Sequence, residues 1–297
     1  MYDREEEMKK IIILISIYND WKSVFKLIES IDLKVADWDA AISILIANDA
    51  STEDRPKTEI KLKKIISVRI INMKKNRGHA RCNASGLKYI SERDDFDYVI
   101  PMDGDGEDRP EELNLLIDKI KHYPDAVVTA NRVKRSEGFI FKFCYQIHKH
   151  LTLIFTGQTI KYGNYTCLPK FIVNEMVNEP ATWSSFSGSL AKIERDRKSI
   201  PSTRGKRYFG PSKMSFINLL KHSLSIIAVF KKNFLIRSIL FLIAYLFLIR
   251  GNISIVTLIP VIGIIIMMFS VIILSKRENM SEFDNSLENI ETIDKIK

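Results

Sequence analysis

The stretch YVIPMDGDGEDRPEEL, residues 98–113, decides the fold. Its apolar beginning, Tyr98–Met102, predicts a buried strand, and the pattern over Pro110–His122 predicts a helix that Asp108 caps. Between them, four acidic side chains stand within six residues: Asp103, Asp105, Glu107 and Asp108. A strand, a charged turn and a helix in direct succession are typical of an α/β domain.

The acidic turn is a candidate metal site. Asp103, Asp105 and Glu107 alternate along it, so their oxygens can face one hard ion such as Mg2+ or Mn2+. A calcium loop of the EF-hand type is excluded, because its sixth position would be Asp108 rather than Gly and its twelfth Asn114 rather than Glu. For this turn taken alone, an acidic loop that only faces solvent remains the alternative.

Further apolar runs and helical patterns surround this stretch. Strands are predicted at Ile11–Ile17, Ala41–Ala47, Val68–Asn72 and Ala126–Thr129. Helices are predicted at Trp21–Ser30, behind an Asp20 cap, and at Ala80–Glu92. This alternation predicts a Rossmann-like α/β domain with a largely parallel sheet, in which ligands bind at the carboxyl ends of the strands.

Two apolar segments follow near the C-terminal end. Residues 253–275 carry no charge over 23 positions, and residues 234–249 are apolar apart from Arg237. Because about 20 apolar residues span a bilayer, we expect a transmembrane hairpin; buried core helices are the alternative. By the positive-inside rule, both ends of the hairpin lie in the cytoplasm, because basic residues flank it there: Lys231, Lys232, Arg237, Lys276 and Arg277.

Composition excludes several classes of protein. The chain has 297 residues, 46% hydrophobic and 27% charged, which is too apolar for a disordered protein. Its three cysteines stand far apart, which excludes a disulfide framework and a cysteine-based zinc site and favours a reducing compartment. The five histidines form no HExxH pair.

Four motifs, in this order, resemble one known family. They are YND at 18–20, NDAS at 48–51, the N-x-G-x-A-x-x-N-x-x-G run at 76–86, and MDGDGEDRPEEL at 102–113. They resemble the YNE, DDGS and MDADLQDPPE signatures of family 2 glycosyltransferases with the GT-A fold. Three positions depart from the pattern, Ser16 for Pro, Asn48 for Asp and Glu107 for Gln, whereas both aspartates of the DxD remain.

A narrower resemblance lies in RYFGPSKM at 207–214, followed by an amphipathic helix and the hairpin. This succession is similar to polyprenyl-phosphate glycosyltransferases, the group of the dolichol-phosphate mannose synthases and bactoprenol glucosyltransferases. Together the resemblances cover about residues 9–275.

The resemblance implies a nucleotide-sugar donor and Mg2+ or Mn2+, held by Asp103, Asp105 and Glu107. The implied donor-binding residues are Tyr18, Asp20, Asp49, Gly78, Arg81 and Asp103. The implied catalytic residues are Asp105, Arg132 and Arg135. For Arg81 a surface cation, and for the other two arginines a solvated basic loop, is the alternative.

Charge indicates the acceptor. Residues 192–237 hold 12 basic and two acidic residues, a balance of +10 against +9 for the whole chain. This segment lies next to the hairpin, so it favours an anionic membrane and a lipid phosphate over a nucleic acid. Arg207 and Lys213 are the cations expected to bind that phosphate, and the resemblance at 207–214 implies that Ser212 joins them. A polyprenyl phosphate is already ionised, which agrees with the lack of an ED pair at 169–189 and of any QxxRW motif.

The sequence therefore predicts an inverting glycosyltransferase that moves a sugar from a nucleotide-sugar donor to undecaprenyl or dolichyl phosphate. We expect an integral protein of a bacterial inner membrane, with its catalytic domain and both termini cytoplasmic. The segments are an N-terminal tail at 1–8, the GT-A domain at 9–214, an amphipathic helix at 215–232, the hairpin at 233–275 and a mobile tail at 276–297. A hydroxyl acceptor in cell-surface glycan or glycolipid assembly, and a catalytically silent sugar-nucleotide binder, remain the alternatives. A homo-oligomer is left open.

Overall fold

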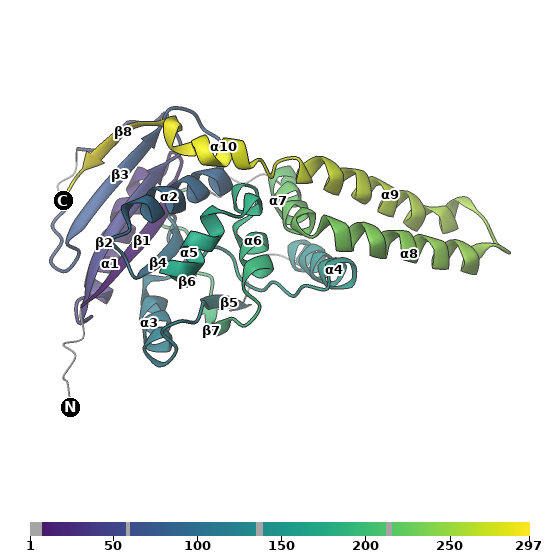
Figure 1. Cartoon of the computed structure of the whole chain (residues 1–297), viewed down its shortest axis with the longest axis horizontal. Helices are drawn as coiled ribbons and strands as arrows, with labels where there is room; N and C mark the ends of the chain where they lie inside the picture. Colours follow the sequence, from purple (N-terminus) through teal and green to yellow (C-terminus); the bar gives the residue numbers. More distant parts are fainter. Residues whose placement is uncertain (1–7, 58–59, 135–138, 212–215) are drawn as a thin grey trace.

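The computed structural model describes residues 8–57, 60–134, 139–211 and 216–297. Within them, eight strands form one mixed sheet in the order β7-β5-β6-β4-β1-β2-β3-β8 (Figure 1). The strands are β1 (Lys9–Ile17), β2 (Ala40–Asn48), β3 (Ser67–Met73), β4 (Tyr98–Asp103), β5 (Val128–Lys134), β6 (Thr166–Pro169), β7 (Lys198–Thr203) and β8 (Ile290–Lys295).

The central strands of the sheet are parallel, as predicted. β1 lies between β2 and β4, and β2 also pairs with β3. The register sets Ile17 opposite Asn48 and Ser16 opposite Asp103, so three carboxyl ends meet at one edge of the sheet. Alternate residues of β1 enter different cores, Ile13 on one face and Leu14 on the other, which explains why the strand is apolar throughout.

Helices cover both faces of the sheet. α1 (Trp21–Lys34) and α3 (Leu113–His122) contribute to one core. The other core contains α2 (His79–Arg93), α5 (Lys170–Val177), α6 (Phe186–Ile193) and the 3-10 turn η2 (Pro180–Trp183). The predicted helix over 110–122 is divided into a 3-10 turn, η1 (Pro110–Glu112), and α3.

Neither residue predicted to cap a helix caps one with its side chain. Asp20 is the N-cap residue of α1, as predicted, but its side chain makes no capping hydrogen bond and instead pairs with Arg207. Asp108 is not the residue before η1, which is Arg109; its carboxylate accepts the N–H of Asp103. Both carboxylates are therefore drawn into the edge of the sheet rather than used to begin a helix.

The half of the sheet beyond β4 was predicted only in part. β5 begins two residues later than expected and continues to Lys134. β6 pairs antiparallel with β4 and β5, and β7 pairs parallel with β5. β6 is only four residues long and β7 contains Pro201, so neither has the apolar run that marks a strand in the sequence.

The prediction of a mobile tail at 276–297 is wrong. After the hairpin the chain forms α10 (Met280–Asp284) and a 3-10 turn, η3 (Asn285–Asn289), and β8 then pairs antiparallel with β3. The ring of Phe283 is fully buried in the core under α2. The buried Phe283 ring and the pairing of β8 at the edge of the sheet tie this segment to the domain. Figure 1 shows α10 and β8 lying against the domain.

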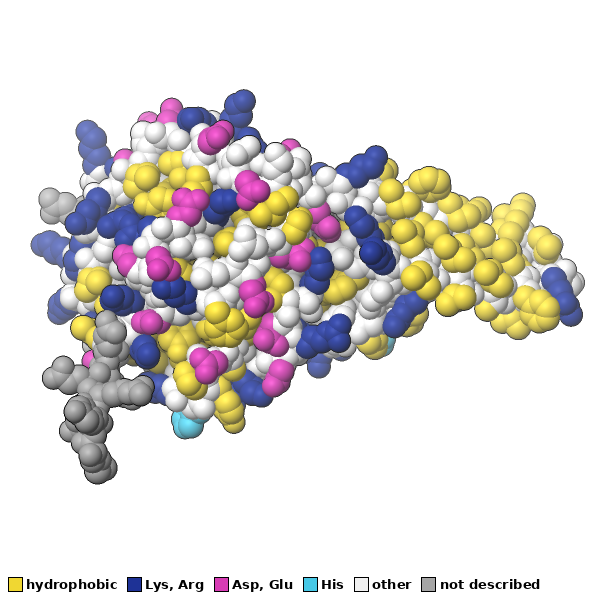
Figure 2. All heavy atoms as spheres, in the orientation of Figure 1, with side chains coloured by type: hydrophobic (Ala, Val, Ile, Leu, Met, Phe, Trp, Pro, Cys, Tyr) yellow, Lys and Arg dark blue, Asp and Glu magenta, His cyan; other side chains and the backbone are white. Residues whose placement is uncertain are grey.

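The hairpin protrudes from the domain (Figure 1). α8 (Lys231–Ile249) and α9 (Ile255–Ser275) are long and apolar enough to cross a membrane. Hydrophobic side chains cover their visible surface, and basic side chains gather where they leave the domain (Figure 2). Phe234 and Val271 pack there with residues of α4 (Phe139–Thr156) and α7 (Phe216–Val229), so four helices form the base of the hairpin.

Candidate active site

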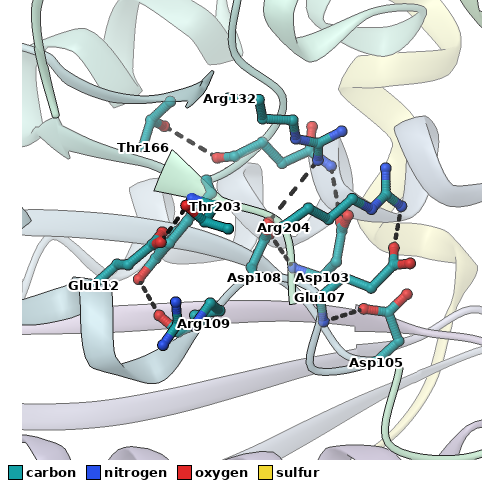
Figure 3. Close-up of polar contacts among 12 residues, drawn as sticks. Asp103, Asp105, Glu107, Asp108, Arg109, Glu112, Arg132, Thr166, Thr203 and Arg204 are labelled. Atoms are coloured by element: carbon teal, nitrogen blue, oxygen red, sulfur yellow. Dashed lines mark hydrogen bonds and ion pairs between the residues drawn. The ribbon is translucent and has the colours of Figure 1, made fainter. Parts of the chain in front are cut away.

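The acidic turn at the end of β4 is shaped by its own side chains. Asp108 accepts the backbone N–H of Asp103 at 2.9 Å, and Asp105 accepts that of Glu107 at 2.9 Å (Figure 3). Gly106 has a φ of 85°, and a side-chain carbon there would lie 2.7 Å from the ring of Tyr208. Only glycine therefore fits the corner of this turn.

Residues 204–208, which we call the strap, lie over the acidic turn. The N–H of Gly205 donates to the carbonyl of Glu107 at 2.8 Å, and the N–H of Tyr208 donates to that of Asp105 at 2.9 Å. Arg204 pairs with the Glu107 carboxylate (Figure 3). Arg207 pairs with Asp105 and, through Nη2 at 2.7 Å, with Oδ2 of Asp20. The strap thus brings two guanidinium groups to the acidic edge of the sheet.

Asp103 has a different set of neighbours. His79 Nε2 lies 3.4 Å from its Oδ1, and Asn164 Nδ2 lies 3.3 Å from the same oxygen. Asn164 Nδ2 also lies 2.6 Å from His79 Nε2, which ties the two neighbours together. Arg132, predicted to be catalytic, stands 3.9 Å from Asp108 Oδ1 beside this group (Figure 3).

The three carboxyl groups titrate differently. Burial opposes ionisation of Asp103, but the charges of His79 and Arg132 and the Asn164 hydrogen bond lower its pKa. Burial and the charge of Asp103 raise the pKa of Asp105 to about 6. Burial and the same charge, against the opposing effect of Arg132, raise the pKa of Asp108 to about 8. Burial and the charge of Asp103 therefore both oppose ionisation of the other two carboxyl groups.

The predicted metal ligands do not converge in this structure. Asp103 faces His79, Asp105 faces Arg207 and Glu107 faces Arg204. Among the residues that the structure describes, no group of three or more His, Cys, Asp or Glu side chains is placed to hold one ion. Metal binding by this set of carboxylates stays a prediction.

Two of the predicted donor-binding residues, Asp49 and Gly78, meet where β2 ends and α2 begins. Asp49 is buried, and its two oxygens accept the N–H groups of Arg77 and Gly78, both at 2.9 Å. Gly78 precedes α2 with a φ of 90°, which only glycine adopts readily. Asn48, where the family has Asp, donates instead to Asn72 on the next strand at 2.9 Å.

The other donor-side predictions have mixed outcomes. Tyr18 lies at the end of β1 with 41% of its surface exposed, so it can contact a ligand. Arg81, in the first turn of α2, has its guanidinium 5.2 Å from the centre of the Trp183 ring and 3.2 Å from a carboxylate oxygen of Glu282. That position favours a structural role. Three predicted residues, Arg135, Ser212 and Lys213, lie outside the described residues.

Sequence reasoning missed His79, Asn164 and Arg204. His79 follows Gly78 at the start of α2, shortly after the end of β3. This position in the sequence could have marked it as a site residue. Arg204 was counted only within a basic segment. Asn164 stands in an irregular connection before β6, 61 residues from Asp103, so no local pattern marks it.

Comparison with known proteins identifies relatives of this arrangement. Residues 12–173 match the family model described as glycosyl transferase family 2. Undecaprenyl-phosphate 4-deoxy-4-formamido-L-arabinose transferase of Erwinia tasmaniensis is 27% identical over 223 residues, covering 73% of this chain and 66% of that protein. The transferase of the same name from Klebsiella pneumoniae strain 342 is 26% identical, over 72% of this chain and 65% of that protein. The chain thus matches slightly less than two thirds of the length of these relatives.

Solved structures share the fold at low sequence identity. Glucosyl-3-phosphoglycerate synthase of Mycobacterium tuberculosis, in complex with Mn2+, UDP-glucose and phosphoglyceric acid, has a TM-score of 0.52 at 14% identity, covering 76% of this chain and 79% of that chain. Mannosyl-3-phosphoglycerate synthase of Rubrobacter xylanophilus has a TM-score of 0.51 at 12% identity, over 74% and 72%. These similarities confirm the predicted GT-A type of α/β domain.

Proposed function

We propose that this chain, which belongs to glycosyl transferase family 2, moves a sugar from a nucleotide-sugar donor to a polyprenyl phosphate at a membrane surface. The relatives from Erwinia tasmaniensis and Klebsiella pneumoniae are undecaprenyl-phosphate transferases, which supports the lipid acceptor. The family and the acidic edge of the sheet support the donor.

The observation that most strongly supports a lipid acceptor is the short stretch of chain between the base of the hairpin and the site. Gly157 lies against α8, since a side-chain carbon added to it would be 3.1 Å from Nη2 of Arg237. Seven residues later along the chain, Asn164 contacts Asp103. Because an extended residue spans at most about 3.6 Å, the site lies within roughly 25 Å of the base of the hairpin. A phosphate at the membrane surface, joined to a long flexible lipid, can reach such a site.

The chemistry needs little from the protein beyond charge and position. An oxygen of the ionised lipid phosphate attacks the anomeric carbon, the bond from that carbon to the donor phosphate breaks, and the nucleoside diphosphate leaves with the electron pair. No proton has to be removed from the acceptor, and attack opposite the leaving group inverts the anomeric carbon. We assign Arg132, Arg204 and Arg207, which now pair with carboxylates at this edge of the sheet, to the phosphate oxygens of the substrates.

The side chains of the acidic turn are of the kind that binds a divalent ion. Asp103, Asp105 and Glu107 offer only oxygen ligands, and each now faces a positively charged or protonatable partner. A bound Mg2+ or Mn2+ would neutralise the pyrophosphate as it leaves. Mn2+ in the Mycobacterium tuberculosis enzyme supports this assignment.

The hairpin and the charge around it support a membrane location. The base of the hairpin is basic, as expected for contact with anionic lipid (Figure 2). β8 beyond the hairpin and β1 before it belong to the same sheet, so both flanks of the hairpin lie on one side of the membrane. We place that side in the cytoplasm, where nucleotide sugars are made.

The donor is tested with the purified full chain and undecaprenyl phosphate in detergent. A panel of nucleotide sugars is supplied with Mn2+, with Mg2+ or with a chelator, and the lipid products are identified by mass. We expect one sugar to be transferred in the presence of a divalent ion and none with the chelator. Hydrolysis of a donor without lipid product, or no reaction with any donor, would contradict the proposal.

A further inference from the structure

Two arginines of the strap form ion pairs with the carboxylates that would bind the proposed metal. Arg204 pairs with Glu107, and Figure 3 shows its guanidinium directed at that carboxylate. Arg207 joins Asp105 to Asp20, which belong to the ends of two adjacent strands. A divalent ion on Asp105 and Glu107 would take the oxygens that these guanidinium groups now contact.

The Arg207 contacts are partly buried. Only 16% of the Arg207 side chain, 14% of that of Asp105 and 16% of that of Asp20 are exposed. Its Nε is buried without a hydrogen-bond partner among the described residues. The two carboxylates therefore provide most of what holds this guanidinium in place, and a cation on Asp105 would both remove a partner and repel it.

The backbone of the strap is held independently of these side chains. Gly205 and Tyr208 donate hydrogen bonds to carbonyls of the acidic turn, and the Tyr208 ring covers Gly106. Lys26 of α1 lies 4.7 Å from the centre of the same ring. The guanidinium groups can therefore move away from the carboxylates while the strap stays on the turn.

We propose that Arg204 and Arg207 are internal counter-cations, which hold Asp105 and Glu107 in the metal-free protein and exchange for the divalent ion when it binds. The inference deepens the proposed function and rests on it for its second step. In that step Arg207, released from Asp105, becomes available to the lipid phosphate.

The exchange predicts that removing a cation next to the site strengthens metal binding. Mn2+ is titrated into the purified full chain without donor or acceptor, and its dissociation constant is measured by calorimetry. We expect Arg207→Ala and Arg204→Ala each to bind Mn2+ roughly three- to tenfold more tightly than the wild type, as for loss of a competing ion pair. Arg207→Gln, which keeps most of the side-chain volume, should change the affinity in the same direction if the alanine variant unfolds.

Lys206 provides the matched control. It lies between the two arginines in the strap and is exposed, so Lys206→Ala removes the same charge from nearly the same place. We expect less than about a twofold change, because a screened surface charge acts weakly. If Lys206→Ala increased the Mn2+ affinity as much as the arginine variants do, the effect would come from net charge alone, and the exchange would be overturned.

Other outcomes separate the inference from the proposed function. Arginine variants that bind Mn2+ no more tightly than the wild type, including no detectable binding by any of them, would contradict the exchange even if lipid product is formed. Tighter binding in both arginine variants, lost again when Asp105→Ala is added, would support the exchange even if the acceptor is not a lipid phosphate.

Discussion

The ring of Phe283 stacks on Trp183 with their centroids 5.4 Å apart, and both side chains are fully buried. Trp183 Nε1 also donates a hydrogen bond to Glu282 at 3.0 Å. Trp183 belongs to the domain before the hairpin, and Phe283 and Glu282 to α10 after it. The C-terminal segment is therefore part of the folded domain, and the hairpin is attached to that domain at both ends.

This attachment predicts a large loss of stability when the Phe283 ring is removed. Phe283→Ala should lower the free energy of unfolding by about 3 to 5 kcal/mol, because it leaves a cavity against Trp183. Thermal unfolding in detergent measures the effect. Ile293→Ala in β8, where the side chain is 51% exposed, should cost less than about 1 kcal/mol. Equal melting temperatures for the two variants would show that the segment is not anchored in this way.

The same attachment predicts the topology of the termini. Protease-sensitive tags placed at residue 2 and after Lys297 should both be cut from the cytoplasmic side of sealed membranes, because β1 and β8 lie in one sheet. Cleavage of the two tags from opposite sides would contradict the paired crossing of α8 and α9.

Asp32 predicts a pH dependence of stability. Burial opposes its ionisation, but hydrogen bonds from the backbone N–H groups of Ile65, Lys63 and Lys64, with the charge of Lys297, lower its pKa below 3.8. A lowered pKa in the folded state stabilises the protein above the unfolded value of 3.8, and this contribution is lost as the pH falls through the folded value.

We therefore expect Asp32→Asn to destabilise the protein by about 1 to 3 kcal/mol at neutral pH and to reduce the loss of stability in acid. Denaturant unfolding between neutral and strongly acidic pH measures both effects. A variant whose stability falls with acid as steeply as that of the wild type would show that Asp32 does not carry this dependence.

The proposed metal site predicts that Asp105 is needed for sugar transfer. Asp105→Ala should reduce sugar transfer by at least about a hundredfold with Mg2+ or Mn2+, because a ligand of the charge-neutralising ion is lost. The melting temperature should change little, since the turn lies outside the hydrophobic cores. Asp118→Ala, on the exposed surface of α3, is the matched control and should keep full activity. Near-normal transfer by Asp105→Ala would remove this carboxylate from the mechanism.

The parallel half of the fold could be predicted because its strands are buried on both faces. β1 and β2 read as continuous apolar runs, and the polar residues that follow them had to meet at one edge. β8 could not be found in this way, because its exposed, polar residues pair with β3 from far along the chain. Phe283 is one aromatic residue in a polar segment, so composition alone indicated a mobile tail.

The candidate site was predictable to the same extent. Asp103 ends a buried strand and Asp105 follows it, which fixes both at the edge where ligands bind. Arg207 was recognised as a phosphate ligand, but its pairing with Asp20 joins residues 187 positions apart. Such a contact depends on how the strap returns over the sheet, and no local spacing encodes that path.

The acceptor is tested most directly by comparing undecaprenyl phosphate with undecaprenol, which differ only in the phosphate. Each is incubated in neutral detergent with the purified chain, Mn2+ and the nucleotide sugar that the donor panel identifies. The masses of the lipid products are then measured by mass spectrometry. The account predicts a product equal to undecaprenyl phosphate plus one sugar residue, and no product from undecaprenol. Equal transfer to undecaprenol, or undecaprenyl phosphate left unchanged, would contradict it.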